Sequence, residues 1–349
     1  HHREPRALAQ PRSTKHALEH HHADASRLDH SNLITHPAHE LAESALGTDP
    51  AVAALASGAN APVGCRRYTA LLGTGSLDVP LFLTCPTYRA ASALRRRLGD
   101  PNDYTSAARY STNSGTAIGA TRTEAIVHGL AELVERDAFS LLLVRTFLVR
   151  RPRPLKLVDP RTLPDDVRHL HAYASRDVPV HLIDMTTDVG VPAYCAFAGR
   201  AHGEGASLSS RYALQRALSE LLQMRALTTR EHHPAPDLGV LTGRPRLLAA
   251  ARLELAARLA GAERVTFIET EAPATPEQHA ERLATALETT GHRPYAATVQ
   301  TAPNGVCTVS VFAPGLERFF AITTGLAVVP GPRGLRHFAD ETGVAATGA

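Results

Sequence analysis

Cysteine is scarce in this sequence, and none is placed to form a metal or redox motif. The four cysteines lie far apart and include no C-x-x-C pair: Cys65, Cys85, Cys195 and Cys307. This spacing argues against a zinc ribbon or a disulfide framework and fits a reducing cytoplasm. No hydrophobic run approaches the length of a membrane span, and the N-terminus lacks an apolar signal-peptide core. We therefore expect a cytoplasmic protein that does not contact membranes.

Lysine is rarer still, and the net charge is small. Lys15 and Lys156 are the two lysines, so the positive charge is almost entirely arginine, and the formal net charge is +3. So small an excess does not favour a nucleic-acid surface, and we expect no nucleic-acid partner. Arginine suits bidentate contact with carboxylate or phosphate, although a GC-rich coding sequence produces the same bias.

The hydrophobic pattern predicts an α/β fold. The 349 residues, 44% of them hydrophobic, are enough for one large domain or two smaller ones. Apolar, β-branched runs predict strands at 78–85, 178–185, 191–199, 264–270 and 307–313. Helical patterns lie at about 120–148, 210–228, 246–261 and 276–290. Candidate linkers at 150–166 and 230–246 punctuate this alternation without dividing it.

Residues 1–60 are rich in histidine and alanine. His20, His21 and His22 are the obvious metal-ligand candidates in this segment. Consecutive residues point in different directions on a helix, so the three side chains make a poor chelate. We do not expect a metal site in this tract.

The stretch SGTAIG (114–119) supplies small residues before a predicted helix. It is neither a Walker loop, because no G-K-[ST] follows, nor a G-x-G-x-x-G fingerprint. Backbone N–H groups in such a loop can approach an anion, helped by the partial positive charge of the helix N-terminus. A plain entry into the helix explains the same residues.

The helix that follows carries an acidic stripe. At about 100° per residue, one stripe roughly 80° wide contains Glu124, His128, Glu132 and Glu135. The opposite side is apolar and is the expected core face: Ile126, Val127, Leu130, Leu133 and Val134. Carboxylates beside an anion-binding loop are suited to Mg²⁺, which prefers oxygen ligands. The alternative is an acidic face exposed to solvent.

A second helix, YALQRALSELLQMRA (212–226), combines an acid, a base and an amide. Arg216, Glu220 and Gln223 share one face, whereas Arg225 points elsewhere on a straight helix and should serve another contact. This face either joins the acidic stripe in one site or forms a surface salt bridge.

Together these segments resemble the YcaO family, ATP-dependent enzymes that activate peptide backbone amides. The family's central motif has an S-N-G-type loop, G-x-T-x-x-E-A and E-x-x-E-R, matched here by Ser111, Asn113, Gly119, Thr121, Glu124, Ala125, Glu132, Glu135 and Arg136. ALSELLQMR is similar to the later motif E-x-x-Q-x-R through Glu220, Gln223 and Arg225. APGLERF (313–319) resembles the P-G-L-E element, and VVPGPRG (328–334) contains a candidate late arginine, Arg333. The resemblance spans roughly residues 60–340.

The resemblance implies a YcaO-type α/β fold, with mixed sheets packed with helices and a nucleotide site that is not a P-loop. The implied cofactors are ATP and Mg²⁺. The implied ATP-binding residues are Ser111, Asn113, Ser114, Arg136, Glu220, Gln223, Arg225 and Arg333. The implied metal ligands are Glu124, Glu132, Glu135 and Glu19. We expect His128 to complete the polar stripe rather than to contact nucleotide.

The sequence departs from the family pattern in two places. The nearest counterpart of an earlier motif, S-x-x-x-E-x-x-E-R, is RSTKHALEHHHAD (12–24), where Glu19 and His20 occupy the E-R positions and His16 replaces the first glutamate. Azoline-forming members often end in a P-x-P-x-P tail, whereas this sequence ends in ETGVAATGA. We therefore predict an N-terminal segment with a degenerate first motif (1–60) and a YcaO catalytic domain (61–349).

The resemblance also implies a reaction and partners. The implied activity is ATP-dependent cyclodehydration of Cys, Ser or Thr in a ribosomally made precursor peptide, giving thiazolines or oxazolines of a bacteriocin or antibiotic. Because no leader-binding domain and no flavin site are visible, the implied partners are a separate E1-like leader-binding protein and an FMN-dependent azoline dehydrogenase. The alternatives are thioamide or amidine formation, a non-catalytic YcaO scaffold subunit, and a generic α/β domain with chance motifs.

Overall fold

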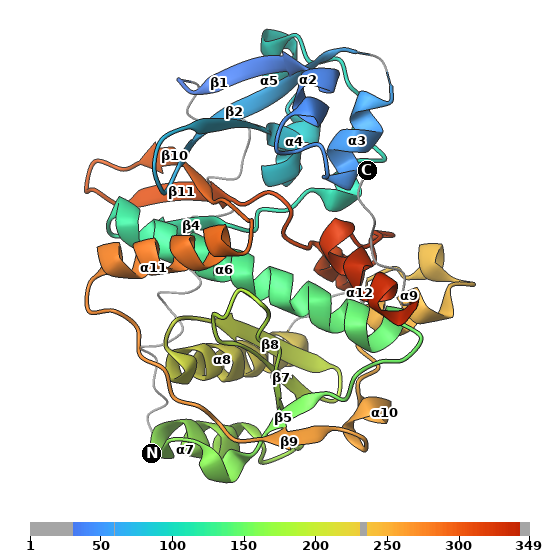
Figure 1. The fold of residues 1–349 in the computed structure, drawn as a ribbon, viewed down its shortest axis with the longest axis vertical. Coiled ribbons are helices and arrows are strands. Elements are labelled where there is room, and N and C mark those ends of the chain that lie inside the picture. The colour runs from blue at the N-terminus through green and yellow to red at the C-terminus, as the bar shows by residue number, and fades with distance from the viewer. Residues whose placement is uncertain (1–30, 59, 231–235, 343–349) are drawn as a thin grey trace. The chain divides into compact units, whose positions relative to one another are not determined.

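The computed structural model describes residues 31–58, 60–230 and 236–342, and the chain forms two compact units (Figure 1). Of the described residues, those up to 130 and those in 276–285 and 293–314 form unit 1, and those in 131–275, in 286–292 and from 315 onward form unit 2. The boundary predicted at residue 60 falls within unit 1, because strand β1 (Leu33–Pro37) pairs with strand β2 (Pro62–Ala70). The histidine tract at 20–22 and the first-motif candidate at 12–24 lie outside the described residues.

Unit 1 is built on an antiparallel sheet with the strand order β1-β2-β10-β11-β4, and β3 also pairs with β2. Strands β10 (Tyr295–Thr301) and β11 (Cys307–Phe312) form a hairpin, which confirms the strand predicted at 307–313. The loop predicted at 114–119 is wrong, because most of it is strand β4 (Thr116–Gly119), paired with β11. Ala117 and Ile118 of this strand are buried beside β11.

The short helices of unit 1 interrupt one predicted strand. The run DVPLFLTC continues β3 (Ser76–Pro80) only to Pro80, after which α4 (Leu81–Thr84) forms a helical turn. A continuous apolar run has no period that separates a buried strand from a buried helical turn. The other short helices are α2 (Ala38–Glu43), α3 (Pro50–Ala56), η2 (Pro86–Ala90), α5 (Ser92–Leu98) and η3 (Ala108–Tyr110).

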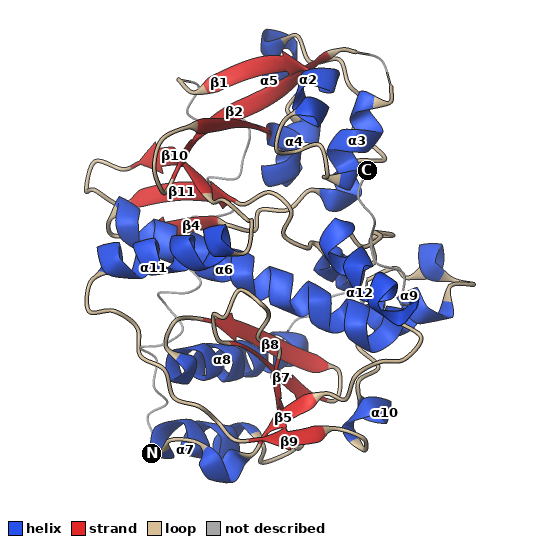
Figure 2. Cartoon of the chain, in the orientation of Figure 1, coloured by secondary structure: helices blue, strands red, loops and turns tan. Residues whose placement is uncertain are grey.

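Unit 2 contains a second, mixed sheet with the strand order β8-β7-β6-β5-β9 (Figure 2). Its strands are β5 (Lys156–Val158), β6 (His181–Asp184), β7 (Ala193–Ala198), β8 (Ala201–Ala206) and β9 (Glu263–Val265). β5 and β9 are parallel and the other pairs antiparallel. The predicted strands at 178–185 and 191–199 are confirmed, whereas the strand at 264–270 shrinks to the three residues of β9.

Helices α7 (Asp165–Ala174) and α8 (Ser210–Arg230) cover one face of this sheet. The core between them combines alternate residues of β7 with the apolar side of α8, for example Ala196 and Ala198 with Leu214 and Leu218. Because side chains alternate along a strand, Cys195 and Phe197 face the opposite side of the sheet. That opposite side is where the polar residues of β8 are found.

Two long helical predictions have different outcomes. Helix α6 (Arg122–Leu143), followed by a π-helical segment, η4 (Val144–Leu148), confirms the helix predicted at 120–148. The helix predicted at 246–261 is instead two short helices, α9 (Pro245–Ala251) and α10 (Ala256–Leu259). Leu253 between them has φ 48, a left-handed conformation that a continuous helix does not permit.

The remaining elements complete both units. Helix α11 (Pro276–Thr289) confirms the prediction at 276–290. The others are η5 (Pro160–Thr162), η6 (Gly239–Leu241), η7 (Phe319–Thr324) and α12 (Pro332–Thr342). Among the described residues, no helix has both the length and the apolar character needed to cross a bilayer.

Candidate functional site

Glu124, predicted as a metal ligand, lies in the first turn of α6 and caps it. Thr121 Oγ1 accepts a hydrogen bond from the Glu124 N–H at 3.2 Å, and Glu124 Oε2 accepts one from the Thr121 N–H at 3.2 Å. This reciprocal pair is a capping box, which satisfies backbone donors that a helix start leaves unpaired. The T-x-x-E part of the central motif therefore has a structural function in this chain. About three helical turns separate Glu124 from Glu135, too far for both to bind one ion.

The predicted ATP-binding loop residues form a tight turn in unit 1. Asn113 O accepts a hydrogen bond from the Thr116 N–H at 2.9 Å, and Ser114 Oγ lies 2.8 Å from Thr112 Oγ1. Gly115 follows with φ 83, a left-handed conformation that glycine adopts without strain. Ser111 Oγ is buried and has no hydrogen-bond partner. The turn leads into β4 and not directly into α6. Its polar groups are therefore the Ser111 hydroxyl and the backbone groups of the residues that follow.

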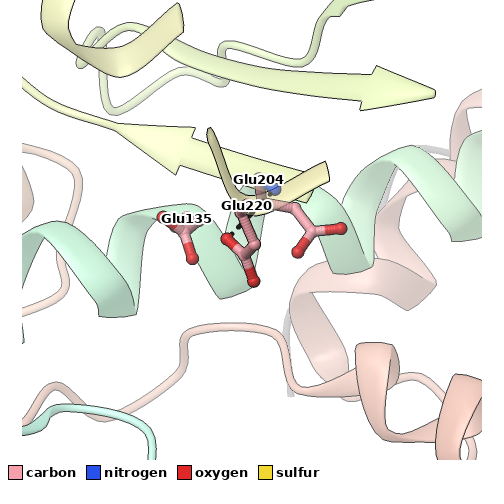
Figure 3. Close-up of side chains that lie close together, drawn as sticks. All are labelled: Glu135, Glu204 and Glu220. Atoms are coloured by element: carbon pink, nitrogen blue, oxygen red, sulfur yellow. Dashed lines mark hydrogen bonds between the residues drawn. The ribbon is translucent and has the colours of Figure 1, made fainter. Parts of the chain in front are cut away.

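Three carboxylates meet in unit 2, and we call them the carboxylate cluster: Glu135, Glu204 and Glu220. They come from α6, β8 and α8, and each offers a carboxylate oxygen within 4.8 Å of the others (Figure 3). Glu135 is 1% exposed and Glu204 is 2% exposed. The solvent-face interpretation of the acidic stripe is therefore wrong at Glu135. Glu135 of the acidic stripe and Glu220 of the polar face of α8 lie close together, which is the first of the two alternatives given for α8.

Two arginines flank the carboxylate cluster at distances longer than a close ion pair. Arg136 lies 3.4 Å from Glu204 and 3.9 Å from Glu135, and Arg216 lies 3.4 Å from Glu135. Charge-assisted hydrogen bonds normally measure about 2.7–2.9 Å, so these guanidinium groups are only loosely engaged. Arg216 of α8 faces Glu135 of α6, so it takes part in a contact between two helices rather than in a surface salt bridge alone.

Burial and mutual repulsion shift the ionisation of this group. Burial raises the pKa of Glu204 to about 7, with Arg136 opposing and Glu135 reinforcing the shift. Burial, Glu204 and Glu135 raise the pKa of Glu220 to about 7. Burial by itself would lower the pKa of Arg136, but the surrounding glutamates, including the half-buried Glu132, raise it above its ordinary value. Burial and repulsion therefore disfavour the ionised forms of Glu204 and Glu220, and a cation held between the carboxylates would favour those forms.

Glu204 was not predicted from the sequence, and the glycines beside it explain its position. A Cβ on Gly203 would lie 2.3 Å from Leu221 N and 2.4 Å from Ala217 O, both backbone atoms of α8. Gly203 and Gly205 thus let α8 pack directly on β8, while Glu204 between them faces the other side. β8 is an edge strand, so the backbone on its outer side has no neighbouring strand to pair with. The Glu204 N–H donates a hydrogen bond to the Glu220 carboxylate at 3.3 Å. The signal in the sequence is the glycine-flanked acid of GEG (203–205).

Replacing Gly203 with Ala should separate α8 from β8. The new methyl group would overlap backbone atoms that no rotamer change can move, so we expect a loss of about 1–3 kcal/mol in the free energy of unfolding. Urea denaturation followed by circular dichroism measures this loss. Gly261→Ala is the matched control, because a Cβ there meets nothing within 4 Å. Equal stability of the two variants would contradict the close packing described.

The residues of the carboxylate cluster fit a divalent cation. Glu204 Oε1 is buried and accepts no hydrogen bond, although His202 Nε2 lies 3.4 Å away. Buried polar atoms are almost always satisfied, so an orphaned carboxylate oxygen on a member of this cluster requires an explanation. All three side chains offer oxygen, which Mg²⁺ prefers.

Gln223 and Arg225, predicted to bind ATP, lie elsewhere on α8. Gln223 is exposed. Arg225 Nη1 donates a hydrogen bond to Ala174 O at 2.6 Å, and Nη2 donates to Val178 O at 3.5 Å. These carbonyls follow the end of α7, so the guanidinium joins α7 to α8. The prediction from helix geometry that Arg225 serves another contact is confirmed.

Arg333, the predicted late ATP-binding arginine, forms a buried ion-pair network. Its guanidinium donates to Asp137 Oδ1 at 2.8 Å and Oδ2 at 3.0 Å, and also binds Asp188. Asp137 Oδ1 additionally accepts the Glu317 N–H at 2.8 Å. The Glu317 carboxylate in turn accepts the N–H groups of Gly331 and Gly334, at 3.0 and 2.8 Å. This network ties α12 and the segment before it to α6.

Of the predicted site residues, the structure brings together Glu132, Glu135, Arg136 and Glu220. It places Ser111, Asn113, Ser114 and Glu124 in unit 1. Glu19 lies outside the described residues. Their ATP- and metal-binding functions remain predictions.

Solved structures of YcaO enzymes share the fold. A heterocyclase in complex with substrate and cofactor has a TM-score of 0.59 and 17% identity, covering 87% of this chain and 43% of its own. YcaO from Methanopyrus kandleri, bound with AMPPCP and Mg²⁺, has a TM-score of 0.56 and 21% identity, with 76% and 68% covered. The E. coli microcin synthetase McbBCD complex with pro-MccB17 bound has a TM-score of 0.58 and 12% identity, with 88% and 78% covered. The predicted fold class, mixed sheets packed with helices, is confirmed.

Sequence comparison reaches the same family. An uncharacterised protein of Methanothermobacter thermautotrophicus is 35% identical over 164 residues, which are 44% of this chain and 39% of the relative. The match therefore spans about two-fifths of that relative's length. The profile of the family described as "YcaO cyclodehydratase, ATP- and Mg²⁺-binding" matches residues 16–317. With most of its length inside that match, the chain belongs to the YcaO family, whose members bind ATP and Mg²⁺.

Proposed function

We propose that this protein is an ATP- and Mg²⁺-dependent cyclodehydratase acting on backbone amides of a precursor peptide. The observation that carries the proposal is the carboxylate cluster with its two flanking arginines. Glu135 and Arg136 come from the central family motif and Glu220 from the later one, so two motifs far apart in the chain converge. Carboxylates to hold a metal beside guanidinium groups to bind phosphate are what ATP-dependent phosphoryl transfer requires.

The proposed reaction forms a five-membered ring from Cys, Ser or Thr. The side-chain thiol or hydroxyl adds to the carbon of the preceding amide carbonyl, losing its proton, and the carbonyl oxygen takes the γ-phosphoryl group of ATP. Loss of that oxygen as phosphate, together with the amide proton, leaves a C=N bond in a thiazoline or oxazoline. The peptide loses the elements of water, and ATP becomes ADP and phosphate. Phosphorylation is needed because an amide oxygen is otherwise a very poor leaving group.

The residues of the chain have separable functions in this proposal. When bound, Mg²⁺ supplies positive charge that stabilises the phosphoryl oxygens. Glu132 and Glu135 hold the ion from α6, and Glu220 contributes from α8. The loosely engaged guanidinium group of Arg136 is available to phosphate, for which arginine is well suited. We also propose that Ser111, Asn113 and Ser114 of unit 1 bind ATP. Glu124, which caps α6, is a proposed metal ligand apart from the ion at Glu135.

The proposed partners are a precursor peptide and proteins that present and oxidise it. The microcin synthetase neighbour is a complex with pro-MccB17 bound, which supports an assembly of this type. We propose an E1-like protein that binds the leader peptide and an FMN-dependent dehydrogenase that converts azolines to azoles. We also propose a cytoplasmic location, where ATP is available.

Peptide mass and phosphate release test the proposal together. The protein is incubated with Mg-ATP, its precursor peptide and the leader-binding protein, and we expect the peptide to lose about 18 Da per ring, with one phosphate released each time. The mass follows from the loss of one water in a phosphate-coupled cyclisation. A gain of about 16 Da with sulfide supplied would indicate thioamide formation instead. Tight peptide binding without mass change or phosphate would leave the scaffold alternative standing.

A further inference from the structure

Glu204 is the member of the carboxylate cluster that neither recognised motif contains. It lies on edge strand β8, held between two glycines that pack on α8, and it is 2% exposed. Its Oε2 faces Arg136 at 3.4 Å, and its Oε1 accepts no hydrogen bond. The Glu204 carboxylate is therefore buried, and one of its two oxygens has no hydrogen-bond partner. A charge in that situation is costly unless a cation accompanies it.

The neighbours of Glu204 define which cation fits. His202 stacks on Phe139 at 5.4 Å between ring centroids, and its ring nitrogens are not among the donor atoms that lie within 4.8 Å of one another in the carboxylate cluster. Cys195, the cross-strand neighbour of Glu204, is fully buried, and its sulfur is likewise not among those donor atoms. The remaining donors are carboxylate oxygens, which favour Mg²⁺ or Mn²⁺ over zinc.

When all three carboxylates of the cluster are ionised, their charge exceeds that of the two guanidinium groups by one, so a cation can be bound there. Three carboxylates face Arg136 and Arg216, and both arginines stand at 3.4 Å or more from their partners. All three ligands and both arginines belong to unit 2. The carboxylate oxygens lie within 4.8 Å of one another, a spacing that one ion can bridge with modest side-chain movement. No nucleotide group is required to bring them together.

We propose that Glu204 is a ligand of a divalent cation held by the carboxylate cluster, and that this site binds Mg²⁺ or Mn²⁺ in the absence of ATP. The inference rests on the proposed function for the identity of the metal and adds a ligand and an order of binding. The metal enters a preformed site between α6, β8 and α8, and nucleotide then binds to the metal-loaded protein. Hard-ligand sites of three carboxylates are sufficient to hold a divalent ion together with water.

The test is a titration of the metal-free chain with Mn²⁺, without nucleotide, in which electron paramagnetic resonance reports free Mn²⁺. We expect the wild type to bind one ion tightly and Glu204→Gln to weaken that binding by at least about tenfold. Glu263→Gln is the matched control, since Glu263 is an exposed glutamate of the same sheet, and it should bind as the wild type does. Circular dichroism establishes that each variant is folded.

Glu204→Asp provides a second measurement that retains the negative charge. Mg²⁺ alone should raise the melting temperature of the wild type, because a ligand that binds the native state stabilises it, and should raise that of Glu204→Asp less. Equal Mn²⁺ affinity in the wild type and Glu204→Gln, or no Mn²⁺ binding by the wild type, would overturn the inference. Absence of phosphate release and peptide modification by the wild type would instead overturn the proposed function and leave the Mn²⁺ result intact.

Discussion

Replacing Glu135 with Gln should reduce peptide-dependent phosphate release by at least about a hundredfold. Glu135 is a buried carboxylate of α6 that lies near Arg136 of the same helix and Arg216 of α8. An amide of the same shape keeps the volume but loses the negative charge that holds a metal ion. Metal ions stabilise phosphoryl-transfer transition states by several kcal/mol, and each 1.36 kcal/mol corresponds to a factor of ten in rate.

Glu135→Gln should nevertheless fold. A buried carboxylate is costly to desolvate, so a neutral amide relieves that cost. The side chains of Arg216 and Arg136 remain 22% and 26% exposed, so water can solvate the guanidinium groups that lose their partner. Circular dichroism and the melting temperature check folding, and phosphate release with peptide and Mg-ATP measures turnover.

Two further variants make this result decisive. Glu132→Gln removes a half-buried carboxylate one turn earlier on α6 and should also impair turnover. Glu263→Gln removes an exposed glutamate in the same unit and should leave the rate unchanged. Full activity in both Glu132→Gln and Glu135→Gln would show that α6 does not hold the metal.

The helical part of the site could be predicted because its information is local. Spacing along α6 placed Glu132 and Glu135 on one stripe, and helix geometry separated Arg225 from the face of Glu220. The same reasoning grouped Glu124 with them, although T-x-x-E is also the signature of a capping box. Angular position around a helix does not report distance along it, and Glu124 lies about three turns away.

Glu204 could not be placed from spacing, because its position depends on contacts between distant segments. The hydrogen bond from Glu204 to Glu220 and the ion pair from Arg136 to Glu204 join residues separated by 16 and 68 positions. A glycine on each side of an acid marks close backbone packing, but it does not say which helix approaches. The strand β4 was missed for a related reason, since its small residues gain their strand conformation from the neighbouring β11. Tertiary context overrides local propensity in both cases.

Replacing Arg333 with Met should lower the free energy of unfolding by about 3–5 kcal/mol, the cost of leaving a buried charge without its partner. The Asp137 side chain is fully buried and receives two hydrogen bonds from Arg333. Methionine fills much of the volume but donates none of them. Lysine should recover the stability only in part, because its ammonium group cannot match both carboxylates as the planar fork does. Chemical denaturation measures the loss.

Arg336→Met is the matched control, because Arg336 is an exposed arginine one turn along the same helix. It should change stability by less than about 0.5 kcal/mol, as surface substitutions usually do. The double variant Asp137→Asn with Arg333→Met should regain part of the loss, since it removes the stranded charge together with its partner. Equal effects of Arg333→Met and Arg336→Met would contradict the buried network. So would weaker ATP binding by Arg333→Met at unchanged stability, which would favour a nucleotide contact instead.

The pH dependence separates the ion pair from simple packing. The hydrogen bond from Arg333 lowers the pKa of Asp188 below its ordinary value, although burial opposes the shift. A carboxylate whose pKa is lower in the folded state stabilises the protein above its unfolded pKa, about 3.9, and loses that contribution as the pH falls through the folded value. The difference in stability between the wild type and Arg333→Met should therefore be constant near neutral pH and shrink only below about pH 4. A difference that stays constant down to the acid-unfolding range would mean that Arg333 stabilises α12 through packing rather than charge.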